Sequence, residues 1–457
     1  MKKVAIGGGQ GFWGDSPDAA IHMVRHADIQ YMACDYLAEL TLSIMQRQRL
    51  KRPEAGYARD FIGMMKEIGK VAKERNIKIL TNAGGMNITG CVDTLKEALL
   101  AQGVQNYRIG YVTGDDMMGQ IDELMSQGVT FENMDDPQVG DFKDIRSKLV
   151  NANVYFGRQP MMECLDGGAD VVLTGRASDS ALFLAPLARE FGWTDADLDQ
   201  LARGIMVGHM LECGGQGAGG NFLYDWRSVP RMDELGFPIA EVTEDSLQIT
   251  KAPDCGGLIS EQSVKEQFLY EVHDPANYIT PDVTVDISHA TIRNAGPDRV
   301  EVGGIRGKPA PDRLKLSLGY HAGYKVVTYL PFGWPDAYEK AQYAADILMK
   351  KMRRKGMQYE DIRIDYLGVN ALHMGLAEVN EEMLKNLNEC VLRIAIRTKE
   401  KRDAALIIPE ISPLQLNGPP GACFFGGRSH VEDVIGLWPT LIPRDAVKLQ
   451  SHILEVK

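Results

Sequence analysis

The first 220 residues alternate short apolar runs with segments of helical periodicity. Apolar runs of strand length lie at residues 4–6, 29–34, 77–80, 107–112 and 169–173. Amphipathic helical patterns lie between and after them, at residues 37–50, 58–76, 92–102, 158–165, 179–191 and 195–212. Strands that alternate with helices in this way are typical of βαβ units. The pattern therefore predicts an α/β fold with a wound, mostly parallel sheet and helices on both of its faces.

The pattern changes after residue 220. Alternating apolar and polar positions predict a hairpin at residues 240–242 and 247–250 and further strands at 283–287, 300–302 and 314–318. Beyond these, helical and extended patterns alternate up to a strand at 391–396. We therefore expect two domains, a wound α/β domain over residues 1–220 and an α+β domain over residues 221–457.

Composition narrows the range of functions. The chain has 457 residues, 44% of them hydrophobic, which is too long for one compact core. Its formal net charge of −12 argues against a nucleic-acid partner, because binding to the phosphate backbone depends on Lys and Arg. We expect no signal peptide, because the first apolar run is short and leads into a glycine-rich loop, and no apolar run of about 18 residues follows. We expect a cytoplasmic protein that does not bind membranes.

Cysteine spacing gives no sign of a disulfide framework or a structural zinc site. The seven cysteines are scattered without a C-x-x-C pair. The sequence also lacks the H-x-x-x-H and H-E-x-x-H patterns of histidine metal sites. We therefore assign no metal ligands, although a divalent cation held by carboxylates stays an alternative.

The loop after the first strand is the first candidate ligand site, because ligands of open parallel sheets bind beyond the carboxyl ends of the strands. Gly9, Gly11 and Gly14 have the G-x-G-x-x-G spacing of a dinucleotide loop, with Gln10 among them, and Asp35 ends the second strand where a ribose-binding acid would stand. Bulky residues at positions 12 and 13 count against NAD(P). A plain turn, or a site for another anion, explains the glycines as well.

Polar loops also follow the third and fourth strands. Their candidate ligand-binding residues are Asn82, Gly84, Asn87, Thr113 and Gly114. The adjacent carboxylates Asp115 and Asp116 are suited to acid and base roles or to a divalent cation. The alternative is that one of them caps the helix that follows.

The fifth strand of the predicted sheet ends in a similar cluster. Gly175, Arg176, Ser178 and Asp179 lie within one turn of each other. The Arg176 guanidinium is suited to a carboxylate or phosphate. The alternative is that Ser178 or Asp179 only caps the next helix.

The densest polar and glycine-rich cluster comes after the last helix of the first domain. His209 and Glu212 are three positions apart, so they share a helix face, and Gln216 and Asn221 follow in a glycine-rich loop. One His and one Glu are too few ligands for a metal, so an acid/base pair is the better hypothesis. A plain helix end with a glycine cap is the alternative.

Several of these stretches together resemble one known family. Gly7–Asp15, Thr113–Asp116, Gly168–Asp179, Gly208–Asn221 and Asp274–Tyr278, taken in order, are similar to the acyclic terpene utilisation protein A (AtuA) family. The resemblance spans nearly the whole chain and implies a role in the catabolism of branched or terpenoid acids, usually as coenzyme A thioesters. Some family members continue into an extra small domain, so the resemblance also implies that a separate partner of roughly a hundred residues docks onto this chain.

The leading hypothesis is a lyase or hydro-lyase that acts on an acyl-coenzyme A intermediate. A carboxylate or His209 would remove a proton beside the thioester carbonyl, and loop N–H groups would hold the enolate oxygen. The candidates for proton transfer are Asp115, Asp116, Asp179, His209 and Glu212. An NAD(P)-dependent oxidoreductase and a non-catalytic ligand-binding or assembly subunit are the alternatives. We expect a small-molecule substrate and a homo-oligomer.

Overall fold

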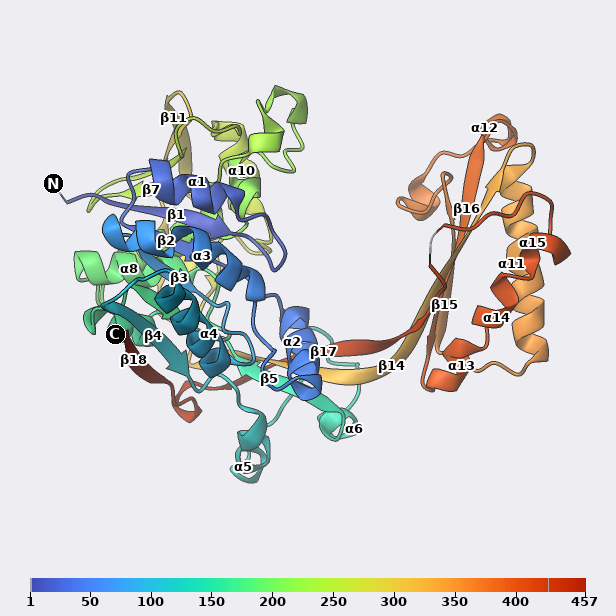
Figure 1. The fold of residues 1–457 in the computed structure, drawn as a ribbon, viewed down its shortest axis with the longest axis horizontal. Helices are drawn as coiled ribbons and strands as arrows, with labels where there is room; N and C mark the ends of the chain where they lie inside the picture. The colour runs from blue at the N-terminus through green and yellow to red at the C-terminus, as the bar shows by residue number, and fades with distance from the viewer. Residues whose placement is uncertain (1, 426) are drawn as a thin grey trace. The chain divides into compact units, whose positions relative to one another are not determined.

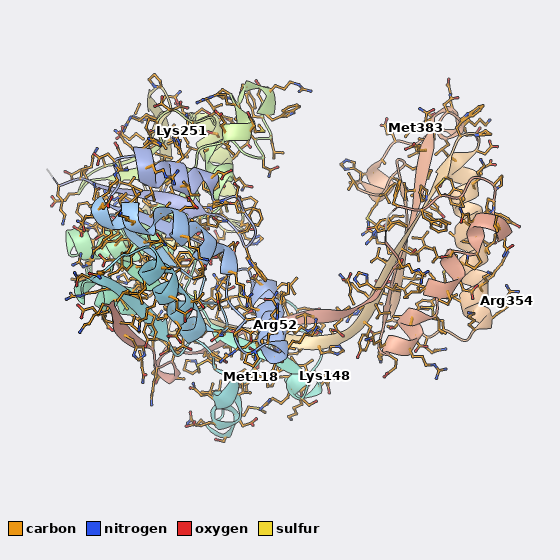
Figure 2. All side chains as sticks on the ribbon, in the orientation of Figure 1. Arg52, Met118, Lys148, Lys251, Arg354 and Met383 are labelled. Atoms are coloured by element: carbon orange, nitrogen blue, oxygen red, sulfur yellow. The ribbon has the colours of Figure 1, made fainter. Side chains whose placement is uncertain are left out.

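The computed structural model describes residues 2–425 and 427–457, which form two compact units. The first unit contains the residues up to Gly319 together with Leu437–Lys457, and the second is Tyr320–Gly436. The ribbon is drawn in Figure 1, and Figure 2 adds the side chains. No helix of the described residues has both the length and the apolar character that crossing a membrane requires.

A ten-stranded sheet forms the centre of the first unit, in the order β11-β12-β8-β7-β1-β2-β3-β6-β4-β18. Five consecutive strands of this sheet run parallel, and they are the five expected from the first 220 residues. They are β1 (Val4–Gln10), β2 (Tyr31–Cys34), β3 (Lys78–Thr81), β6 (Val171–Leu173) and β4 (Tyr107–Thr113). The α/β class is confirmed.

Antiparallel strands extend this sheet on both sides. Next to β1 lie β7 (Pro238–Val242), β8 (Leu247–Lys251), β12 (Arg299–Gly303) and β11 (Thr291–Gly296), and next to β4 lies β18 (Gln450–Val456). The predicted hairpin is β7 and β8. The sequence-based boundary at residue 220 does not coincide with the division between the compact units, because β7 pairs with β1 and so continues the same sheet.

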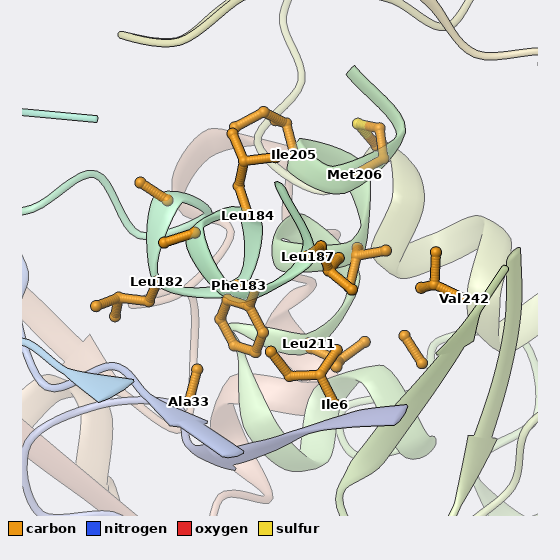
Figure 3. Close-up of a cluster of buried hydrophobic side chains, with 14 of the residues drawn as sticks. Ile6, Ala33, Leu182, Phe183, Leu184, Leu187, Ile205, Met206, Leu211 and Val242 are labelled. Carbon is orange, nitrogen blue, oxygen red and sulfur yellow. The ribbon is translucent and has the colours of Figure 1, made fainter. Parts of the chain in front are cut away.

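Helices cover both faces of the sheet, because successive side chains of its inner strands point to opposite faces. Ala5 and Met32 lie on one face of the sheet and pack against α1 (Asp18–His26), α3 (Arg59–Glu74) and α4 (Ile88–Ala101). Ile6 and Ala33 lie on the other face and pack against α7 (Gln159–Asp166), α8 (Ala181–Phe191) and α9 (Leu198–Leu211). Figure 3 shows the second cluster, in which Phe183 of α8 lies above the strands.

Smaller elements complete the first unit. They are α2 (Glu39–Lys51), α5 (Ile121–Ser126), α6 (Phe142–Arg146), β5 (Leu149–Val154), α10 (Glu261–Leu269) and a three-stranded sheet of β9 (Tyr278–Ile279), β10 (Thr284–Asp286) and β13 (Arg306–Lys308). Short 3-10 turns lie at Met118–Gln120, Gly214–Ala218, Trp226–Ser228, Met232–Glu234 and Arg444–Ala446. β5, which was not predicted from the sequence, pairs with β14 (Arg313–Gly333).

The second unit has a sheet in the order β15-β16-β14-β17. The strands are β14 (Arg313–Gly333), β15 (Asp361–Leu367), β16 (Glu389–Thr398) and β17 (Val431–Pro443), and β14 and β17 include residues of both units. One face is covered by α11 (Ala337–Arg354), α13 (Lys401–Ala405), α14 (Ile408–Ile411) and α15 (Leu414–Asn417). A short turn at Met374–Leu376 and helix α12 (Glu381–Lys385) lie between β15 and β16 in the chain. Alternate residues of β16 enter this core, as a half-buried strand requires.

Candidate functional site

A cavity of about 1190 Å³ lies beyond the carboxyl ends of the parallel strands, within the first unit. It is lined by residues that follow β1, β2 and β6, by the end of α9 and its glycine-rich loop, and by segments near residues 270–281 and 311–315. Of the predicted site residues, the cavity is lined by Gly11, Asp35, Ser178, Asp179, Glu212, Gln216 and Asn221. The remaining predicted residues lie behind this wall or outside it.

The glycine loop after β1 is packed against the end of α9. A Cβ at Gly11 would lie 2.7 Å from the carbonyl carbon of Cys213, and a Cβ at Gly9 would lie 2.6 Å from the Cys34 sulfur. At these two positions, glycine allows other segments of the same chain to pack closely against the loop. Helix α1 begins only at Asp18, after Gly14, whose N–H donates to Asp60 at 3.1 Å. A dinucleotide loop would place its last glycine at the helix start, which this loop does not do.

Gln10 belongs to the same loop and is buried. Its Nε2 donates to the Asp15 carbonyl at 2.7 Å. The side chain thus supports the loop and does not line the cavity.

Asp35 is held at the cavity wall by the residue that ends the neighbouring strand. Asn82 Nδ2 donates to Asp35 Oδ1 at 2.6 Å, and Asn82 Oδ1 accepts the Tyr36 N–H at 2.7 Å. Burial raises the pKa of Asp35 to about 6, because the nearby Arg176 charge and the hydrogen bonds only partly offset the loss of solvent and the Glu212 charge adds to it. The pKa of Asp35 is thus closer to neutral pH than that of an ordinary aspartate.

Asp115 is sealed behind the wall. It accepts the Arg176 N–H at 2.8 Å and Asn153 Nδ2 at 3.1 Å, and a Cβ at Gly175 would lie 2.3 Å from its Oδ2. Burial raises the pKa of Asp115 to about 6. Asp116 is exposed and accepts the Met118 N–H at 3.0 Å, but the N-cap position of the turn that follows is held by Met117. Neither carboxylate lines the cavity.

Arg176 is fully buried and is also absent from the cavity wall. Its guanidinium donates to the Leu37 carbonyl, forms an ion pair with Asp179, and lies 4.3 Å from the centroid of the Tyr155 ring. Arg176 thus positions Asp179 at the cavity without lining the cavity itself, and its role in anion recognition stays a prediction.

Glu212 presents its carboxylate to the cavity from the end of α9. Ser180 Oγ donates to Glu212 Oε2 at 2.9 Å, and His209 Nδ1 lies 3.3 Å from Glu212 Oε1. His209 is buried and lies behind Glu212, where its ring packs against Tyr278. The predicted pair is therefore formed, but only Glu212 can contact a ligand directly.

The predicted residues in the loops after β3 and β4 make capping and packing contacts within the fold. Asn87 caps α4 by accepting the Gly90 N–H at 3.2 Å, and its Nδ2 donates to the Ala55 carbonyl. The place of a Cβ at Gly84 lies 2.6 Å from the Thr174 carbonyl oxygen, and Thr113 Oγ1 is 3.0 Å from His452 Nε2. Gly114 has a φ of +106°, which favours glycine. None of these residues lines the cavity.

Several cavity residues were not predicted from the sequence, among them Glu39, Tyr155 and Lys315. Lys315 Nζ lies 2.8 Å from Glu39 Oε1 and 5.0 Å from the centroid of the Tyr155 ring. Burial alone would raise the pKa of Glu39, but the Lys315 charge and hydrogen bond outweigh it and lower the pKa to about 2. Tyr155 follows β5, a strand that the sequence analysis did not predict, and Lys315 lies in the stretch assigned to another domain. Within residues 2–425 and 427–457, no three His, Cys, Asp or Glu side chains are arranged to hold a metal ion.

Comparison with known proteins gives one match that decides the family. The model of the acyclic terpene utilisation family protein AtuA matches residues 4–453. The chain belongs to the AtuA family. No curated protein and no solved structure matches it significantly. Membership of the AtuA family confirms the resemblance and implies involvement in acyclic terpene utilisation. The homo-oligomer and the small partner chain stay predictions.

Proposed function

We propose that this AtuA-family protein is an enzyme of branched or terpenoid acid catabolism, a lyase or hydro-lyase that acts on an acyl-coenzyme A intermediate. The observation that carries the proposal is the meeting of Asp35, Asp179 and Glu212 at one cavity. They come from three separate elements, the end of β2, the loop after β6 and the end of α9. Reversible removal of water from an acyl chain needs such a set, because one group takes a proton while another gives one.

The size and lining of the cavity support a bulky, partly apolar ligand. At about 1190 Å³ it lies above the range of roughly 300–1,000 Å³ that is usual for small-molecule pockets. Leu37, Leu235, Phe237 and Leu314 supply apolar wall for a branched chain. Gly215 and Gly220 of the glycine-rich loop after α9 also line it, and glycines allow a ligand to approach the backbone closely.

Two of the cavity carboxyl groups, those of Asp35 and Glu212, are suited to the two proton transfers of this reaction. One ionised carboxylate removes the proton beside the thioester carbonyl, and the C–H electron pair forms the enolate. The enolate then expels the hydroxyl group from the next carbon, which leaves as water after it takes a proton from the second carboxyl group. Asp35, with a pKa raised to about 6 by burial, suits either role near neutral pH. Glu212, oriented by Ser180 and His209, suits the complementary one.

The test is a turnover assay on the full chain with a panel of branched 3-hydroxyacyl- and enoyl-coenzyme A thioesters, followed by absorbance of the conjugated thioester. We expect Glu212→Gln to lower kcat at least about 100-fold. Unchanged turnover after substitution of both His209 and Glu212 by alanine would remove the pair from the mechanism.

A calorimetric titration separates the alternatives. Binding of nicotinamide nucleotides in place of acyl-coenzyme A esters would favour an oxidoreductase. Absence of binding by any of these compounds would favour an assembly subunit and contradict the proposal.

A further inference from the structure

The cavity has few cationic groups. Among the described residues that line it, Arg313 and Lys315 alone carry a positive charge, whereas carboxylates are numerous. Arg313 is exposed, and its guanidinium donates to the Leu441 carbonyl at 2.6 Å. Arg176 is fully buried behind the wall. A ligand anion inside the cavity therefore has Lys315 as its nearest suitable cation.

Lys315 is held in place from two sides. Its ammonium group lies 2.8 Å from Glu39 Oε1, at the start of α2. Its carbonyl accepts the Tyr155 N–H at 2.9 Å, where β14 runs beside the end of β5. An ammonium group has three N–H donors, so the bond to Glu39 leaves two for a ligand.

Tyr155 orders the cation further. The centroid of its ring lies 5.0 Å from Lys315 Nζ and 4.3 Å from the Arg176 guanidinium carbon. Attraction between a cation and an aromatic face favours both contacts and keeps the flexible lysine chain near the wall. A cation that is already oriented loses less entropy when it binds an anion.

We infer that Lys315 and Tyr155 form an anion subsite of the cavity, which takes a planar anionic oxygen group of the ligand. That group is a carboxylate of the acyl chain or the enolate oxygen of the thioester. The inference rests on the proposed function, since it assigns to Lys315 the charge stabilisation that proton removal beside a carbonyl requires.

The experiment compares the binding of 3-methylbutanoate with that of its neutral counterpart 3-methylbutanamide by calorimetry on the full chain. We expect the wild type to prefer the carboxylate at least about tenfold, since hydrogen bonds to ionised partners are the stronger ones. Lys315→Gln should abolish this preference and leave amide affinity within about twofold. Lys315→Arg should keep it. Glu39→Gln should strengthen carboxylate binding, because it removes the negative charge that competes with the ligand for Lys315.

The matched control is Lys325→Gln. Lys325 lies on the same strand and pairs with Glu432 at 3.1 Å, and it does not line the cavity. The control should retain the preference. A wild type that binds neither compound, or prefers neither, overturns the inference, and so does a preference that survives in a folded Lys315→Gln. If that variant does not fold, loss of the preference in Lys315→Arg or unchanged carboxylate affinity in Glu39→Gln overturns it.

Two further outcomes separate the subsite from the reaction. Loss of the preference in Lys315→Gln, without turnover of any thioester by the wild type, would keep the subsite and refute the proposed function. Where turnover is seen, a fall in kcat common to all thioesters identifies the enolate as the bound group. A rise in KM confined to thioesters with a free carboxylate identifies the carboxylate.

Discussion

Asp35 and Asp115 follow two parallel strands of one sheet, and they differ in what they face. Both are buried, and burial raises the pKa of each to about 6. Asp35 lies at the wall of the cavity, whereas Asp115 is enclosed by Asn153 and the Arg176 backbone. A raised pKa is therefore a sign of function only where the group can meet a ligand, because structural networks of polar groups raise it as well.

The largest expected difference between the two aspartates is in turnover. Asp35→Asn removes a proton-transfer group and should lower kcat by about 100- to 10,000-fold. Asp115→Asn is the matched control, since it makes the same chemical change behind the wall, and it should lower kcat no more than about threefold once folding is confirmed. Steady-state kinetics on the best thioester of the panel checks this. Equal losses in the two variants would contradict the distinction drawn from the cavity.

The pH dependence of stability should be shared by both aspartates. Their pKa values are raised in the folded state from an ordinary value of 3.8 to about 6, so between about pH 4 and 6 the folded chain holds protons that the unfolded chain has lost. Stability from these groups is present below pH 4 and is lost as pH rises through 6. Relative to the wild type, Asp35→Asn should therefore gain unfolding free energy across this window, by up to roughly 3 kcal/mol. Urea unfolding at pH 4, 5 and 6.5 measures the gain, and a constant difference would contradict it.

Asp115→Ala should reveal the structural role of the enclosed carboxylate. The substitution leaves the Arg176 N–H and the Asn153 amide without their acceptor in a buried place. Buried donors without partners cost free energy, so we expect a loss of about 2 kcal/mol in unfolding free energy at pH 5. Urea unfolding measures it. Asp166→Ala, which removes an exposed carboxylate with one partner, Arg189, serves as the control and should cost less than about 1 kcal/mol.

The five parallel strands could be predicted from the sequence, because each is a short apolar run bounded by polar turns. The sequence also placed the candidate residues at the ends of those strands, and the bonds from Asn82 to Asp35 and from the Arg176 N–H to Asp115 join neighbouring strand ends. Asp179 and Glu212 meet at one cavity, but the segment Thr113–Asp116 does not line it. Local pattern could not predict β18, which joins the sheet beside β4 from the far end of the chain. Such pairing depends on long-range contacts that no window of sequence contains.

The orientation of side chains was the other limit. Gly175, Arg176, Ser178 and Asp179 belong to one turn, yet Ser178 and Asp179 line the cavity while Arg176 is buried behind it. The same residue types at the same spacing would fit a turn whose arginine faces the cavity and a turn whose arginine is buried. Lys315 was missed for a related reason, because a lone lysine in an alternating strand is indistinguishable from a solvent-facing position until its partner Glu39 is known.

The smallest expected effect is at Asp116, the neighbour of Asp115. Its exposed carboxylate accepts the N–H of Met118, the first residue of the short turn at Met118–Gln120. Asp116→Ala should therefore cost only about 0.5–1 kcal/mol of unfolding free energy, the usual size of one lost hydrogen bond. Asp116→Asn keeps an acceptor for the Met118 N–H and should recover most of that loss. Kinetics should match the wild type in both variants, because neither change reaches the cavity wall. A fall in kcat greater than about tenfold in the asparagine variant would mean that the Asp116 charge acts on the reaction, and the separation between the two neighbouring carboxylates would then be wrong.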